Sequence, residues 1–172
     1  MTVGKKSLMV CTAVAVFALC AFASAQALEW GTKEMDTEAL AVQFAEQIKD
    51  GGYKVVTTEE LKGWIDKKEP MLIVDTMPLE ASYKKNHIPG AKQMEFPIEP
   101  MTQLDDATKA KLESLLGPDK NQKIVFYCGF TKCTRSHNGA LWAVKLGYTN
   151  VYRYPGGIKA WMEAGYPVDK EE

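Results

Sequence analysis

Cys128 and Cys133 are the residues of this chain whose type and spacing are best suited to covalent chemistry. They lie five positions apart, and Cys128 directly follows the uninterrupted apolar segment 124–127. Such a segment is typical of a strand covered on both faces of a parallel sheet. Ligands of open parallel sheets collect where a strand ends and the next helix presents unpaired N–H groups. The sequence therefore predicts a thiol at a ligand-binding edge.

The surroundings of Cys128 along the chain predict that its thiol is ionised. Lys132 and Arg135 lie close to it, and a helix is expected from about Ser136. Basic side chains and a helix N-terminus both lower the pKa of a cysteine, and the thiolate is the nucleophilic form. The competing interpretation is a buried, unreactive cysteine that ends a core strand, which is common for this residue type.

The loop after Cys128 can also direct several backbone N–H groups at one point and so form a nest for an anion. The anion would be the thiolate, or the persulfide formed from it. The predicted cradle consists of Gly129, Phe130, Thr131, Lys132, Cys133, Thr134 and Arg135.

The segment from Cys128 to Ser136 resembles the active-site loop of the rhodanese (thiosulfate sulfurtransferase) family. The likeness extends over about residues 54–168, in three separate stretches that follow one another in the right order. The two other stretches are Asp75 with Tyr83 and the sequence His-Ile-Pro-Gly-Ala at 87–91, and the closing segment 147–168.

This resemblance implies a sulfurtransferase that uses Cys128 as its catalytic residue. The cysteine would take a sulfane sulfur from a donor such as thiosulfate, and a thiol or cyanide would then remove it from the persulfide. No organic cofactor or metal is implied. Lys132 and Arg135 are candidate contacts for the donor anion. Many single-domain relatives carry arginines where this chain has Met77 and Cys133, so the cationic rim is thinner here.

A thiol–disulfide redox function is the main alternative. Cys133 would then resolve a persulfide or a sulfenate on Cys128 by forming a disulfide with it. A spacing of five residues around a tight loop permits such a bond without requiring it.

Three further interpretations use the same loop. Zinc binding would need Cys128, Cys133 and His137 with a fourth ligand, whereas His137 is expected to face solvent and His87 to order a turn. A phosphatase would need arginine six residues after the nucleophile, where this chain has Thr134. The third interpretation is a non-catalytic sulfur-binding module that keeps only the fold.

The pattern of the rest of the chain predicts an α/β fold of the rhodanese type. Apolar strands alternate with amphipathic helices, which is typical of a parallel central sheet, here of about five strands, with helices on both faces. The predicted strands are 55–56, 71–74, a brief one after residue 91, 124–127 and 151–154. The predicted helices are 57–65, 79–84, one from Asp105 or Asp106 to about residue 116, 136–146 and 157–164.

Residues 1–25 read as a cleaved signal peptide, with Lys5 and Lys6 before an apolar run that ends in Ala23-Ser24-Ala25. Its removal takes away Cys11 and Cys20. We therefore predict export, to the periplasm if the source is a diderm bacterium and otherwise by secretion, with no stable membrane insertion afterwards. A signal anchor is the alternative.

The exported part divides into an N-terminal extension with one helix (26–53), the rhodanese-like domain (54–168) and a tail (169–172). The extension helix is expected over 37–50, with Asp36 or Thr37 as its cap. The full chain has 172 residues, with 21 basic and 22 acidic side chains, so no electrostatic feature suggests nucleic-acid binding. Its partners are expected to be a small sulfur-donor anion and a thiol or cyanide acceptor.

Overall fold

The computed structural model describes residues 33–171, and the predicted signal peptide lies outside them. Helix α2 (Glu34–Gly51) spans the boundary between two compact units, which meet between residues 43 and 44. Residues 34–43 form the first turns of α2. All other elements, including the last turns of α2, belong to the unit from residue 44 onward, and the candidate site lies in this unit.

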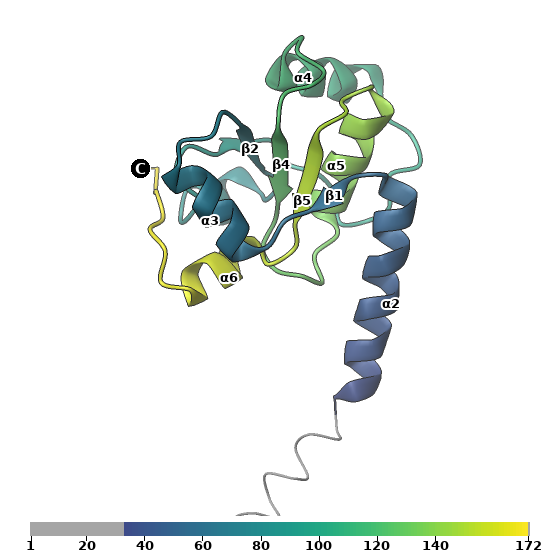
Figure 1. Cartoon of the computed structure of the whole chain (residues 1–172). Coiled ribbons are helices and arrows are strands. Elements are labelled where there is room, and N and C mark those ends of the chain that lie inside the picture. The colour runs from purple at the N-terminus through teal and green to yellow at the C-terminus, as the bar shows by residue number, and fades with distance from the viewer. Residues whose placement is uncertain (1–32, 172) are drawn as a thin grey trace, which may run out of the picture. The chain divides into compact units, whose positions relative to one another are not determined.

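A five-stranded sheet, parallel throughout, forms the centre of this unit (Figure 1). The spatial order of its strands is β1-β5-β4-β2-β3, so the central strand β4 lies between two long neighbours. This confirms the predicted fold class. The strand bounds are Lys54–Val55 for β1, Leu72–Asp75 for β2, Lys92–Gln93 for β3, Ile124–Tyr127 for β4 and Val151–Tyr154 for β5.

Helices cover both faces of the sheet (Figure 1). Their bounds are Thr58–Asp66 for α3, Asp106–Leu116 for α4, Arg135–Lys145 for α5 and Gly157–Glu163 for α6. Successive residues of a strand point to opposite faces, so Phe126 packs in the cluster with α4 and α5 residues, and Tyr127 packs in the cluster with Leu61 of α3 and Trp161 of α6. All four residues of β4 are buried, which is why the strand reads as an unbroken apolar run.

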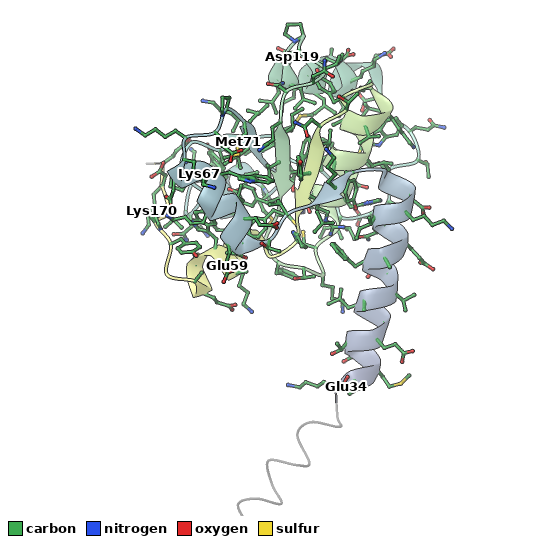
Figure 2. The ribbon with its side chains drawn as sticks, in the orientation of Figure 1. Glu34, Glu59, Lys67, Met71, Asp119 and Lys170 are labelled. Atoms are coloured by element: carbon green, nitrogen blue, oxygen red, sulfur yellow. The ribbon has the colours of Figure 1, made fainter. Side chains whose placement is uncertain are left out.

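Charged side chains lie on the outside of these helices and loops. Glu59 and Lys67, at the two ends of α3, and Lys170 near the C-terminus are exposed (Figure 2). Within residues 33–171, no helix combines the length and the apolar character that a bilayer crossing requires.

Local signals account for the starts of α3 and α4. The Thr57 side chain accepts the N–H of Glu60 while the Glu60 carboxylate accepts the N–H of Thr57, which is the predicted capping box of α3. Asp105 caps α4 by accepting the N–H of Thr108.

Two predictions about helices were wrong in detail. Helix α2 begins at Glu34 rather than at Thr37, because the Thr37 hydroxyl bonds back to the Lys33 carbonyl as an interior residue instead of capping the helix. The predicted helix over 79–84 is a single π-helical turn, η1 (Leu79–Tyr83), in which the N–H groups of Tyr83 and Lys84 bond to carbonyls five residues earlier.

Candidate functional site

Cys128 is the first residue after β4, and its side chain is completely buried. Its Sγ donates to the Cys133 carbonyl at 3.2 Å and lies 3.2 Å from the Ser136 hydroxyl oxygen. The Ser136 backbone N–H is also directed at this sulfur. The first turn of α5, whose N–H groups have no partner within the helix, therefore starts directly over the thiol.

The start of the loop is held by α6. The Cys128 carbonyl accepts the N–H of Ile158 at 2.9 Å, and the Gly129 carbonyl accepts the N–H of Lys159 at 3.0 Å. Gly157 makes this contact possible, since a Cβ there would lie 2.3 Å from the Cys128 carbonyl oxygen. Its φ of +62° is also a conformation that residues with a Cβ rarely adopt.

Cys133 is the more accessible of the two thiols, with 7% of the residue exposed against 0% for Cys128. Both are free thiols, and they interact directly through their side chains. The backbone N–H groups of Gly129 and Arg135 are directed at the Cys133 sulfur. The amides of the loop and of the first turn of α5 are thus divided between two sulfur atoms.

The two thiols differ in their tendency to ionise. Burial raises the pKa of Cys128 well above that of a free cysteine, and its contact with Cys133 adds to this. The hydrogen bond from Cys128, together with the Arg135 and Gly129 amides, lowers the pKa of Cys133 to about 6. The sequence favoured Cys128 as the ionised thiol, whereas the amides of Gly129 and Arg135 are directed at Cys133 and burial opposes a charge on Cys128.

Ser136 and Arg153 are parts of the site that were not among the predicted site residues. The Ser136 hydroxyl accepts a hydrogen bond from Arg153 Nε at 3.0 Å, and Arg153 Nη2 donates to the Cys133 carbonyl at 3.0 Å. Both side chains are fully buried. A serine in the first turn of a helix and an arginine in a four-residue strand are common surface residues, so the sequence gives no signal for either.

On the side of Arg153 away from the thiols, polar residues complete its contacts. Its Nη1 donates to Gln47 Oε1 at 2.6 Å and to the Tyr53 hydroxyl at 3.3 Å. The Tyr53 hydroxyl also lies 2.8 Å from His137 Nδ1. The expectation that His137 faces solvent was wrong, since burial beside the Arg153 charge lowers the pKa of this histidine to about 4.

The remaining predicted cradle residues face outward or make structural contacts. Phe130 is 49% exposed, and Thr131 and Lys132 at the loop tip are exposed as well. The Thr134 hydroxyl donates to the Ile98 carbonyl, and the Arg135 guanidinium binds the Glu95 carboxylate and the Phe96 carbonyl. Lys132 is thus the exposed cation of the loop, whereas the Arg135 side chain is already engaged.

Asp75 and His87 are buried at the same edge of the sheet. Asp75 Oδ1 accepts the N–H of Met77, and burial raises the pKa of this carboxyl although the Tyr127 hydroxyl beside it acts in the opposite direction. His87 Nδ1 bonds to the Tyr83 carbonyl and its ring stacks on the Tyr83 ring, so its side chain contacts the helical turn before it. Among residues 33–171, no three potential metal ligands lie close enough together to hold an ion.

The difference between the thiols predicts selective alkylation. In the reduced protein, iodoacetamide is expected to modify Cys133 at pH 7 and to leave Cys128 unmodified, with a rate that rises with pH and reaches half its maximum near pH 6. Trypsin cleaves after Lys132 and so places the two cysteines in separate peptides, which mass spectrometry can quantify. Faster labelling of Cys128 would contradict the assignment.

Comparisons with known proteins agree with this architecture. The model of the Rhodanese-like domain family matches residues 57–164. Over 108 residues the chain is 26% identical to a thiosulfate:glutathione sulfurtransferase of Saccharomyces cerevisiae, an alignment that covers 62% of this chain and 76% of the yeast protein.

Solved structures show the same fold. A Bacillus halodurans protein superposes with a TM-score of 0.53 at 25% identity, over 76% of this chain and 85% of that one. A thiosulfate sulfurtransferase from Pseudomonas aeruginosa superposes with a TM-score of 0.57 at 19% identity, over 73% of this chain and 22% of that one. The family match, the parallel sheet and the cysteine loop at its edge together show that this chain belongs to the rhodanese-like domain family.

Proposed function

We propose that this protein is a sulfurtransferase that carries a sulfane sulfur as a persulfide on the loop of Cys128 and Cys133. The observation that carries the proposal is the pair of free, touching thiols under the first turn of α5, one of which has a pKa of about 6. Membership of the rhodanese-like domain family and the relative named for sulfur transfer to glutathione support the same class of reaction.

In the first step a thiolate attacks the outer sulfur of thiosulfate. The sulfur–sulfur bond of the donor breaks, sulfite leaves with the electron pair, and a protein persulfide anion remains. In the second step the thiolate of an acceptor attacks the terminal sulfur, so that the acceptor leaves as a persulfide and the protein thiolate is regenerated. The two half-reactions make a ping-pong mechanism.

We assign the first attack to Cys133 rather than to Cys128. An attacking sulfur must touch the donor, and Cys128 is enclosed by the Cys133 carbonyl, the Ser136 hydroxyl and the chain on either side. Cys133 is also buried, but less completely than Cys128, and it has the lower pKa. Cys128 then has the role of a buried partner whose side chain lies beside the charged sulfur and whose thiol donates to the Cys133 carbonyl.

The substrates we propose are small. Lys132 is an exposed cation one residue before Cys133 and can attract an anionic donor, whereas Arg135 is held by Glu95 and the Phe96 carbonyl. A low-molecular-weight thiol or cyanide is the acceptor. Since residues 1–25 have the pattern of a signal peptide, we place this reaction outside the cytoplasm.

Mass spectrometry of the reduced full chain after exposure to thiosulfate tests the proposal. The expected result is the addition of one sulfur atom to the protein, located in the tryptic peptide that begins at Cys133, and its removal by glutathione. Absence of a sulfur adduct with thiosulfate and with a polysulfide donor would refute the function. Hydrolysis of an aryl phosphate, or turnover of a dithiol without any sulfur adduct, would favour the phosphatase or the redox interpretation instead.

A further inference from the structure

Arg153 is a charged residue in the interior of the domain, on the third position of β5. The residue is 0% exposed, and among residues 33–171 no ion pair includes it. Its hydrogen-bond partners are neutral, namely Ser136, the Cys133 carbonyl, Gln47 and Tyr53. The Phe44 ring lies 4.9 Å from the guanidinium carbon.

A buried charge without a counter-charge is strongly unfavourable, because it loses its hydration and gains no ion pair in return. The neutral acceptors around Arg153 compensate for only part of this loss. Retention of an arginine at such a position is expected where a negative charge forms nearby. The groups that Arg153 Nε and Nη2 contact, Ser136 and the Cys133 carbonyl, lie beside the two thiols, which can become negative.

Arg153 reaches the two cysteines through hydrogen-bonded groups beside their sulfur atoms. Arg153 Nε has a hydrogen to donate and no acceptor lone pair, so the Ser136 oxygen is the acceptor at 3.0 Å and its own hydrogen is free for the Cys128 sulfur at 3.2 Å. Arg153 Nη2 donates to the Cys133 carbonyl, which also accepts from Cys128 Sγ. Donors in such a network polarise one another toward a negative charge that forms beside it.

We propose that Arg153 is the buried counter-cation of the negative charge carried by the pair of Cys128 and Cys133, and that it acts on that charge through Ser136 as a positioning residue. The charge is that of the thiolate in the resting protein. The extension to the persulfide anion rests on the proposed sulfurtransferase function.

Other charged groups face the same network. Asp75 faces Cys133 from β2, and its negative charge would oppose a thiolate. Arg135 acts on Cys133 from α5, but it already pairs with Glu95. Asp50 of α2 and Lys145 of α5 act on His137, which lies beyond Tyr53 on the opposite side of the guanidinium.

The test compares alkylation rates of Cys133 as a function of pH in the reduced full chain and in Arg153→Met. Methionine fills much of the space of the arginine stem without its charge. The midpoint of the rate profile is expected to rise by at least about one pH unit, which is a tenfold smaller thiolate fraction below the midpoint. Arg153→Lys is expected to restore part of the shift, because it returns the charge without the two directed N–H groups.

Gln47→Met serves as the matched control, since it removes a partner of the same guanidinium on the side away from the thiols. Its midpoint is expected to stay within about 0.3 pH unit of the original. If Arg153→Met leaves the midpoint equally unchanged, or if Gln47→Met moves it as far, the proposal is overturned.

Thermal unfolding gives a second measurement that remains valid if Arg153→Met folds poorly. At pH 8, Arg153→Met is expected to lower the Tm of the reduced protein. In the double variant Cys128→Ser/Cys133→Ser, which cannot form the thiolate, the same change is expected to leave the Tm unchanged or to raise it. If Arg153→Met lowers the Tm equally in the original protein and in the double serine variant, Arg153 has a purely structural role and the proposal is refuted.

These outcomes are independent of sulfur transfer. If Arg153→Met shifts the midpoint of the alkylation profile but the protein takes up no sulfur, the counter-cation role of Arg153 is supported and the sulfurtransferase function is refuted. If the protein forms the persulfide normally and Arg153→Met leaves the midpoint of the alkylation profile unshifted, the sulfurtransferase function stands and the counter-cation role of Arg153 is refuted.

Discussion

Replacing Cys133 with serine is expected to abolish sulfur transfer, with a loss of kcat/KM on the order of 10³-fold or more. A hydroxyl in this position stays protonated at neutral pH and cannot attack the donor sulfur. The other thiol within residues 33–171, Cys128, is completely buried and has a raised pKa. The measurement is steady-state turnover of thiosulfate with cyanide or glutathione as acceptor, supported by the mass of the protein after donor treatment.

Cys128→Ser is the matched control for this variant, because it keeps a hydrogen-bond donor beside Cys133. It is expected to retain uptake of one sulfur atom, with turnover reduced by about tenfold as the contact between the two side chains changes. The opposite pattern, an inactive Cys128→Ser and an active Cys133→Ser, would return the role of acceptor to Cys128, as the family resemblance implied. Loss of uptake in both variants would make the two thiols inseparable parts of one site.

Gly157→Ala is expected to lower the free energy of unfolding by about 2–4 kcal/mol and to disturb the cysteine loop. The added Cβ would lie 2.3 Å from the Cys128 carbonyl oxygen and 2.7 Å from the Gly129 carbonyl carbon, so either α6 or the loop must move. The two hydrogen bonds from Ile158 and Lys159 to this loop would be lost or weakened. A Tm about 10 °C lower, with the alkylation midpoint of Cys133 shifted upward, is the expected result.

Gly165→Ala separates the effect of the clash from the effect of backbone strain. Gly165 also has a positive φ, of +73°, but no atom lies within 4 Å of a Cβ built there. The expected loss is only the strain of a left-handed alanine, about 1–2 kcal/mol, with no change in the chemistry of Cys133. If both alanine variants lose the same stability and keep the same alkylation profile, the contact between α6 and the loop has no role in the site.

Much of the fold could be predicted because short segments of this chain carry strong local signals. The apolar run 124–127 is a strand because all four side chains are buried, and the reciprocal bonds of Thr57 and Glu60 start α3 wherever the helix packs. The turn at 79–83 was less predictable. Its Pro78 and its small residues permit a helical turn, and packing of Tyr83 in the core selects the wider π-helical form.

By itself, the sequence determined the order of strands and helices, the parallel sheet and the position of a two-cysteine loop at its edge, because these follow from hydrophobic periodicity and turn residues within short stretches of chain. Only the tertiary structure decided which thiol is completely buried, which backbone N–H groups are directed at each sulfur, and that Arg153 donates to Ser136 and to the Cys133 carbonyl beside them. Ionisation depends on water exclusion and on the direction of dipoles. Here these are set by contacts between residues far apart in the sequence, such as Arg153 with Ser136 and with Gln47, which no local pattern records.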